Sequence, residues 1–178
     1  MSTPMSVAQY RDLILQDVAA LPSAQLPLAQ CLGLTTTATV TAHVAVPPFT
    51  NSAMDGFAVH AEDVASASPN NPVTLQVIGE VPAGAVSDEW VGNGQAVRVM
   101  TGAAVPGGAN AVVPVEQTDQ QPGAAPLPDE IRVNGAVGEQ ANIRLAGEDL
   151  AEGDLVLAAG VLLDATSVAA AAATGHGT

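Results

Sequence analysis

Apolar residues near the start of the chain recur at intervals of three and four positions, which is the spacing of one face of an α-helix. They are Val7, Tyr10, Ile14, Val18 and Leu21. Pro22 would end this helix, because proline lacks the amide proton that a further turn needs. A second short apolar group over residues 26–32 precedes Gly33, a residue type common at helix ends. The chain is therefore expected to begin with two helices.

The pattern changes to alternation after residue 35, and alternation predicts strands with one buried face. In the first such stretch, residues 35–46, the apolar positions are Val40, Ala42, Val44 and Val46. Further short runs predict strands at residues 73–79, 97–99, 111–115, 131–133, 155–157 and 161–163. Near the end, Thr166 or Ser167 is expected to cap an alanine-rich helix from Val168 to about Thr174.

Composition agrees with a strand-rich fold. Hydrophobic residues make up 48% of the chain but aromatic residues only 2%, so a core would be built from Ala, Val, Leu and Ile. Side chains branched at Cβ favour strands, and Trp90 is expected to cap this small core. The pattern shifts near Val46 and near Val137. We therefore predict an α+β fold, with a β-rich insert domain at residues 47–137 and an outer, discontinuous mixed α/β domain formed by residues 1–46 and 138–178.

The charge of the chain argues against several classes of partner. It has 18 acidic residues against four basic ones, and its net charge is −14. Nucleic-acid binding needs a basic patch that displaces counterions from phosphates, and four scattered arginines cannot form one. An acidic protein is also repelled by anionic lipid surfaces, and no apolar run is long enough to span a bilayer. We therefore expect a soluble protein that binds neither nucleic acid nor membranes.

The start of the chain and its single cysteine indicate the compartment. The first residues lack the features of a signal peptide, and Cys31 cannot form an internal disulfide, so the cytoplasm is the expected compartment. The two isolated reactive side chains, Cys31 and His43, are expected to have structural roles. Cys31 lies in an apolar segment and is expected to be a buried, unreactive thiol. His43 falls on the polar side of its strand with no second ligand at metal-site spacing, so a solvated histidine is favoured over a metal ligand.

Residues 47–59, PPFTNSAMDGFAV, form the stretch with the most specific local chemistry. The two prolines favour an extended approach, and Asp55-Gly56 suits a tight turn that needs positive φ. On residue types alone, Asp55 bonding its own backbone in a hairpin turn is the simpler interpretation. Two other stretches have the same form, because Thr101-Gly102 and Gly147-Glu148-Asp149 also place polar groups on glycine-bearing turns after strands. Loops at strand ends are common places for functional residues.

The stretch at residues 47–59 resembles the signature of the MoeA family of molybdenum-inserting enzymes, to which the last domain of gephyrin is related. Residues 98–103 with Val105-Pro106, and residues 142–144 with Gly147-Glu148-Asp149, resemble the same family in the same order. Three ordered matches are far more specific than one. Thr50 departs from the pattern, because the family often has an acidic residue there.

The resemblance implies a mixed fold interrupted by a β-rich domain, and an activity. Enzymes of this family insert molybdate into adenylylated molybdopterin with release of AMP, in a cleft between a downstream domain of one subunit and the β-rich insert of the other. By motif, Asp55, Thr101 and Asp149 correspond to residues of that active site. This chain would supply the acidic wall of the cleft, the full-length protein would be a homodimer, and the molybdopterin adenylyltransferase is a candidate partner.

The chemistry of these side chains also suggests a metal. Carboxylates are hard oxygen ligands suited to Mg²⁺, which bridges one or two of them to substrate phosphates, so Asp55 and Asp149 are candidate Mg²⁺ ligands. Candidate residues for binding the substrate are Ser52, Glu116 and Arg144, with Arg144 either pairing with Glu148 or holding a phosphate.

Alternative interpretations stay open. Asp149 could be a helix or turn cap, and Thr101 a strand-end hydroxyl bonded to the backbone. The chain could also belong to a binding or scaffold module without turnover, or to a molybdopterin carrier that binds its ligand without hydrolysing an adenylate. The isolated chain is expected to be inactive in every case.

Overall fold

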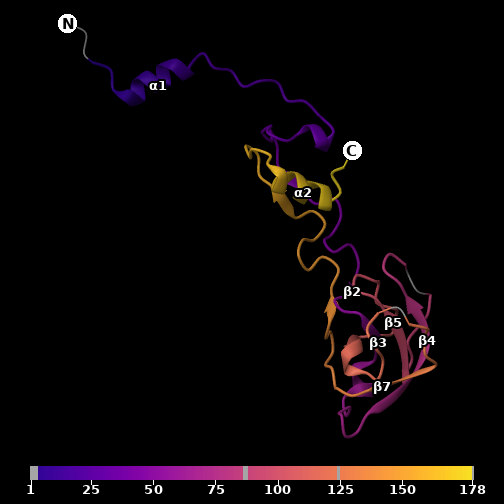
Figure 1. Cartoon of the computed structure of the whole chain (residues 1–178). Coiled ribbons are helices and arrows are strands. Elements are labelled where there is room, and N and C mark those ends of the chain that lie inside the picture. Colours follow the sequence, from indigo (N-terminus) through magenta and orange to yellow (C-terminus); the bar gives the residue numbers. More distant parts are fainter. Residues whose placement is uncertain (1–3, 86–87, 124, 178) are drawn as a thin grey trace.

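The computed structural model describes residues 4–85, 88–123 and 125–177, and its first helix stands apart from the rest (Figure 1). Helix α1 (Val7–Leu15) begins with a capping box, in which Ser6 and Gln9 exchange hydrogen bonds. It ends well before the predicted stop at Pro22. None of its residues is buried, so no tertiary contact supports the apolar stripe beyond Leu15.

Segments from the two ends of the chain meet in a small mixed unit. Strand β1 (Val40–Thr41) pairs antiparallel with β9 (Leu155–Leu157), and helix α2 (Ala165–Ala173) packs near β9 and the 3₁₀ turn η1 (Leu28–Gln30). The second predicted helix is therefore only one 3₁₀ turn. The cap of α2 is Asp164, which accepts a hydrogen bond from the Ser167 backbone, and not Thr166 or Ser167 as predicted.

The long strand predicted at residues 35–46 is mostly irregular. Outside β1, this segment makes only single bridges, from Thr35 to Leu162 and from Val46 to Leu150. The strand predicted at residues 161–163 likewise reduces to the bridge at Leu162. His43 is exposed, as expected, but its ring lies against that of His176, with 3.9 Å between the ring centroids.

A five-stranded sheet organises the middle of the chain, in the order β6-β3-β5-β4-β7. Neighbouring strands are antiparallel except β4 and β5, which are parallel. The strands are β3 (Gly56–Val59), β4 (Val73–Val81), β5 (Gln95–Val99), β6 (Ala111–Pro114) and β7 (Glu130–Val133). All of them except β3 match a predicted strand to within two residues at either end.

The chain joins the two edges of this sheet to each other. After β6 it passes through the 3₁₀ turn η3 (Val115–Gln117), and Thr118 then bridges Val133 of the opposite edge strand, β7. The Asp119 amide donates to Arg132 O at 3.0 Å, and the Asn134 amide to Gln117 O at 2.7 Å. A joined sheet exposes fewer unpaired backbone groups at its edges.

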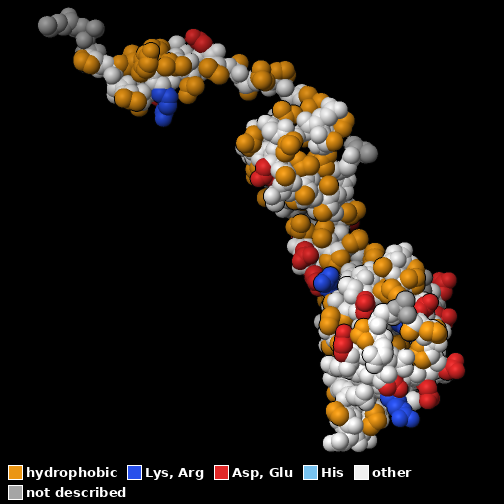
Figure 2. Space-filling view, in the orientation of Figure 1, with side chains coloured by type: hydrophobic (Ala, Val, Ile, Leu, Met, Phe, Trp, Pro, Cys, Tyr) orange, Lys and Arg blue, Asp and Glu red, His pale blue; other side chains and the backbone are white. Residues whose placement is uncertain are grey.

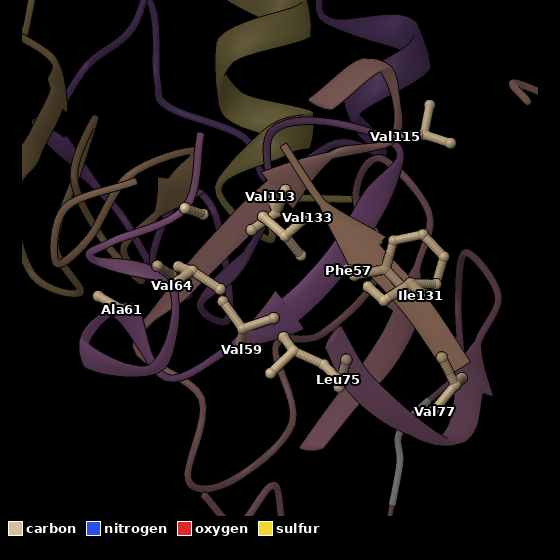
Figure 3. Close-up of a cluster of buried hydrophobic side chains, with 13 residues drawn as sticks. Phe57, Val59, Ala61, Val64, Leu75, Val77, Val113, Val115, Ile131 and Val133 are labelled. Carbon is tan, nitrogen blue, oxygen red and sulfur yellow. The ribbon is translucent and has the colours of Figure 1, made fainter. Parts of the chain in front are cut away.

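Both faces of the sheet are buried. One face carries a cluster that includes Phe57, Leu75 and Ile131 (Figure 3), together with Ala61 and Val64 of η2 (Ala61–Val64). The other face carries a second cluster, built mainly from valines. Trp90 does not cap either cluster as predicted. It is 73% exposed, and its indole lies over Gly107, where an added Cβ would come within 2.7 Å of the ring.

Residues 47–59 contain strand β2 (Asn51–Ser52) and then lead into β3 of the five-stranded sheet. Strand β2 pairs with β8 (Ile143–Arg144) in a separate two-stranded sheet, and the Val46–Pro47 peptide bond before it is cis. The predicted positive-φ turn at Asp55-Gly56 is wrong, because Gly56 has no positive φ and is the first residue of β3. Glycine is required there for another reason, since a Cβ would overlap the Val113 carbonyl of the neighbouring strand.

Strands outnumber helices in the described residues, so the predicted mixed α and β class is confirmed. In that part of the chain, no helix is both long and apolar enough to cross a membrane. Hydrophobic side chains crowd α1 and the segment after it, whereas acidic ones spread over the part that holds the five-stranded sheet (Figure 2).

Candidate functional site

Two of the predicted site residues meet at one end of the neighbouring strands β3 and β5. The Thr101 backbone amide donates to Asp55 Oδ1 at 2.7 Å, and the Thr101 hydroxyl donates to the same oxygen at 2.9 Å. Asp55 precedes β3 and Thr101 follows β5. Because these strands are antiparallel, with Gly56 opposite Val99, the beginning of one and the end of the other lie together.

These hydrogen bonds change the acidity of Asp55. The Thr101 amide, and then its hydroxyl, lower the pKa of the Asp55 carboxyl, because both donors favour the charged form. Asp55 is exposed, so solvent reaches this carboxylate. The pair therefore presents an ionised carboxylate whose orientation is fixed by a residue 46 positions away.

Ser52 is completely buried, and its hydroxyl is already engaged. It donates to Met54 O at 2.6 Å and accepts from the Met54 amide at 3.3 Å. The Ser52 backbone pairs with Gly102 and Ala103, with N···O distances of 2.8 and 2.9 Å. The hydroxyl therefore shapes the turn that leads to Asp55, and its partners lie within the chain.

The Gly147-Glu148-Asp149 motif is held by backbone hydrogen bonds against the start of the 47–59 stretch. The Asp149 amide donates to Val46 O at 3.0 Å, and the Gly147 amide to Pro47 O at 2.9 Å. The Asp149 side chain is exposed and makes no hydrogen bond within the described part of the chain. The motif is thus held against the entry to β2, with its carboxylate free to bind another group.

Arg144 does not pair with Glu148. Glu148 Oε2 accepts a hydrogen bond from the Leu145 amide at 2.9 Å, and the ion pairs of the described residues are Arg11–Asp12 and Arg98–Glu80. Arg144 is exposed on β8, opposite Asn51. It thus remains a candidate for holding an anionic group.

Glu116 lies in η3, directly after the end of β6, and is exposed. The preceding residue, Val115, donates its amide to Asp55 O at 3.0 Å. Glu116 therefore directly follows a residue whose backbone contacts Asp55, but its own carboxylate has no hydrogen bond to the Asp55–Thr101 pair.

The carboxylates do not form a complete metal cage. Across the described residues, no group of three or more His, Cys, Asp or Glu side chains could hold a metal ion. Mg²⁺ commonly takes only one or two protein carboxylates and completes its shell with water and phosphate oxygens. Both Thr101 donors bind Oδ1 of Asp55, which leaves Oδ2 for such a role. The donor set fits a Mg²⁺ ion that takes one carboxylate oxygen from this chain and fills the rest of its shell with other oxygens.

A cavity of about 230 Å³ opens beside Asp55. Its lining includes three side chains that the sequence reasoning did not assign to the site, those of Arg98, Met100 and Gln121. Arg98 is the one charged residue of strand β5, a signal that could have marked it. Gln121 carried no signal, because only the path of the loop after η3 brings it here.

A larger cavity of about 810 Å³ lies in the mixed unit, between residues 24–40 and the C-terminal elements. Cys31, His43 and His176 contribute to its lining. Cys31 is half-buried, less than predicted, and its Sγ lies 3.5 Å from Pro27 O. None of the predicted site residues lines this cavity.

Comparison with known proteins gives a consistent match. Residues 5–175 match the family model described as the MoeA N-terminal region, domains I and II. The molybdopterin molybdenumtransferase 2 of Mycobacterium tuberculosis is 39% identical over 170 residues, which are 96% of this chain and 40% of that protein. The molybdopterin molybdenumtransferase of Staphylococcus aureus is 34% identical over 173 residues, 97% of this chain and 40% of that protein.

Solved structures agree with the sequence matches. The crystal structure of the molybdopterin biosynthesis MoeA protein of Pyrococcus horikoshii OT3 superposes with a TM-score of 0.83 at 36% identity, over 94% of this chain and 44% of that one. The chain thus spans about 40% of the length of the curated relatives it matches. The family expected from the three ordered motifs is confirmed, and the chain belongs to the MoeA family.

Proposed function

We propose that this chain is the N-terminal region of a molybdopterin molybdenumtransferase, which inserts molybdate into adenylylated molybdopterin and releases AMP. The names of the relatives support the reaction class. The observation that carries the proposal for this chain is the Asp55–Thr101 pair, an exposed carboxylate that is oriented by two hydrogen bonds and kept ionised at neutral pH.

The proposed roles follow from the chemistry of each group. Asp55 positions an attacking water, or a Mg²⁺ ion bound to the substrate phosphates, and Thr101 holds the Asp55 carboxylate in place. Asp149 contributes a second carboxylate to the same function. When bound, Mg²⁺ would neutralise phosphate charge that this acidic chain would otherwise repel. Arg144 and Glu116 are proposed to contact the substrate, with Ser52 shaping the turn before Asp55.

The proposal includes the assembly of the complete enzyme. We propose an outer domain formed by residues 1–46 and 138–178, and an insert domain at residues 47–137. The β1–β9 pairing between the two ends of the chain supports this division, as does the density of core contacts between residues 57 and 137. The full-length protein would act as a cytoplasmic homodimer whose cleft has an acidic wall, and would receive its substrate from the molybdopterin adenylyltransferase.

The test is Asp55→Asn in the full-length protein. Asparagine keeps an oxygen for the two Thr101 hydrogen bonds but removes the charge, so the fold should persist. AMP release and molybdate insertion should fall by about 100-fold or more, a typical loss when a positioned carboxylate is removed. Asp129→Asn, at an exposed aspartate before β7, is the matched control and should leave the rate unchanged.

The outcomes separate the alternatives. An Asp55→Asn enzyme with an unchanged rate would refute the assignment of this carboxylate. Tight binding of adenylylated molybdopterin without AMP release by the native full-length protein would identify a carrier. Absence of both binding and turnover would identify a scaffold module. The isolated 178-residue chain is expected to release no AMP.

A further inference from the structure

We infer that His43 and His176 form a binding site for a divalent cation that prefers nitrogen ligands, with Zn²⁺ as its representative. The two imidazoles supply two ligands, and water completes the shell. The two histidines lie near opposite ends of the chain, so no ligand spacing marks them in the sequence. This inference goes beyond the proposed function and does not depend on it.

The turn after α2 brings His176 against His43. The His43 amide donates to Thr174 O at 2.9 Å, and the Thr174 hydroxyl donates back to Ala170 O of α2 at 2.9 Å. Gly175 then adopts a φ of +95°, and an added Cβ there would come within 3.1 Å of the His43 Cβ. The backbone therefore holds the two histidines together without the help of a metal.

The two rings lie close to the separation that a shared metal ion requires. Their centroids are 3.9 Å apart, and their planes are tilted by 40°. Two imidazoles on one tetrahedral Zn²⁺, with Zn–N distances of about 2.0–2.1 Å, have their centroids roughly 5 Å apart, so a shift of about 1 Å admits the ion. His43 is exposed, so its side chain can make this shift without disturbing a packed core.

His176 already has the hydrogen bond that metal-binding histidines make. Its Nε2 donates to Thr41 O at 2.7 Å. Because a carbonyl oxygen can only accept, the proton is on Nε2, and the neutral ring presents the lone pair of Nδ1. Histidine ligands usually donate their second ring N–H to a carboxylate or a backbone carbonyl, which fixes the orientation of the ring and makes it a stronger ligand. His176 is therefore prepared to bind a metal through Nδ1.

The surroundings favour a cation that prefers nitrogen over oxygen. Both imidazoles line the larger cavity of about 810 Å³, and no Asp or Glu among the described residues lines it with them. Mg²⁺ takes oxygen ligands, whereas imidazole suits Zn²⁺, Cu²⁺ and Ni²⁺. The net charge of −14 attracts cations to the molecule in general. Zn²⁺ and Mg²⁺ should therefore prefer different places on this chain.

The site has two protein ligands, which sets its strength and its effect. Cys31 lines the same cavity, but its Sγ lies against Pro27 O, and no group of three potential ligands is found in the described part of the chain. Binding should therefore be weaker than in a closed structural zinc site with four ligands. Because the two ligands follow β1 and α2, bound Zn²⁺ links both ends of the mixed unit and stabilises its folded state.

The experiment is a calorimetric titration of the 178-residue chain with ZnCl₂ and, separately, with MgCl₂. Salt at about 0.15 M screens the non-specific attraction of the acidic surface. We expect saturable binding of Zn²⁺ that Mg²⁺ does not displace, and a higher midpoint of urea denaturation with Zn²⁺. His43→Gln and His176→Gln should each weaken binding by at least about 10-fold, because even the loss of a partner of a metal ligand costs that much. The NMR signals of these two imidazoles should shift on binding.

His60→Gln is the matched control, because the His60 ring is bonded to Val91 O at 3.0 Å, away from the other two histidines. It should bind Zn²⁺ as the native chain does, and so should Cys31→Ser. His176→Gln keeps a side-chain donor for Thr41 O, so its fold should persist, which the urea midpoint without metal checks.

An absence of saturable Zn²⁺ binding, native affinity in His43→Gln, or displacement of Zn²⁺ by Mg²⁺ would overturn the inference. A loss of binding in His60→Gln or Cys31→Ser would also overturn it, because the ligands would then lie elsewhere. The proposed function is tested independently, since none of these variants changes Asp55 or its partners.

Discussion

At the scale of single residues, Asp55 is defined by a contact that is distant in sequence. The local interpretation, an aspartate bonded to its own turn, is wrong, because both hydrogen bonds to its carboxylate come from Thr101. Thr101 was expected either to supply a hydrogen bond in the site or to bond the backbone with its hydroxyl, and the hydroxyl donates to the Asp55 side chain. Asp149 carries no comparable partner, so its role stays a prediction from the motif.

Replacing Thr101 with Val should raise the pKa of the Asp55 carboxyl towards its ordinary value. The substitution removes the hydroxyl donor and keeps the backbone amide, so a part of the lowering should persist. The measurement is an NMR titration of the Asp55 side chain. Thr101→Ser retains the hydroxyl, so Asp55 should titrate in it as in the native chain. If Asp55 titrated in Thr101→Val just as in the native chain, the hydroxyl would not act on Asp55.

The sign of the pH dependence follows from the lowered pKa. The charged form of Asp55 is favoured in the folded state, so its stabilising contribution is complete above the pKa of the unfolded chain. The contribution is lost as the pH falls through the lower folded value. Thr101→Val should therefore reduce the acid-dependent loss of stability that Asp55 causes.

At the scale of elements, the strands of the sheet were predictable but their connections were not. The apolar runs at residues 97–99, 111–115 and 131–133 all became strands. Alternation reports one buried face, and it holds no information on which strand lies next to which. The parallel pairing of β4 with β5, and the bond between Thr118 and β7 that joins the sheet edges, arise only from the path of the loops.

Strand β3 gives the test at this scale, because Gly56 lies directly against the backbone of β6. A Cβ at Gly56 would overlap the Val113 carbonyl, so Gly56→Ala should lower the free energy of unfolding by about 1–3 kcal/mol, as overpacking does. Urea denaturation measures this change. Gly138→Ala, where a Cβ would meet no atom within 4 Å, is the control and should change stability by less than about 0.5 kcal/mol.

An unchanged free energy of unfolding in Gly56→Ala would mean that β3 and β6 can separate at this point without loss. The Asp55–Thr101 geometry, which depends on the position where β3 begins, would then be less rigid than the hydrogen bonds indicate.

At the scale of the whole molecule, the chain divides into parts that differ in burial. The five-stranded sheet has clusters on both faces, whereas every described residue from Pro4 to Pro27 is exposed. The apolar stripe of α1 was read correctly as helical, but its length was overestimated. Short helices are marginal in water without a packed face, and the sequence could not reveal that this face would have no partner within the chain.

Removal of residues 1–20 should leave the stability of the rest unchanged. The deleted residues that the structure describes bury nothing, so the free energy of unfolding should change by less than about 0.5 kcal/mol in urea denaturation. The deletion stops before Ala24, the first residue that lines the larger cavity. A larger loss of stability would mean that α1 packs against the body or against a second copy in solution.

The sequence by itself determined the mixed class, the positions of the main strands, the acidic character and, through three ordered motifs, the family. These properties depend on local periodicity, composition and short motifs, which are readable along the chain. Tertiary structure decided that Asp55 meets Thr101, that Ser52 is buried, and that Arg98 and Gln121 line a cavity beside Asp55. Those facts depend on strand order and on the route of loops, which bring residues together across 20 to 70 positions and leave no periodic trace in the sequence.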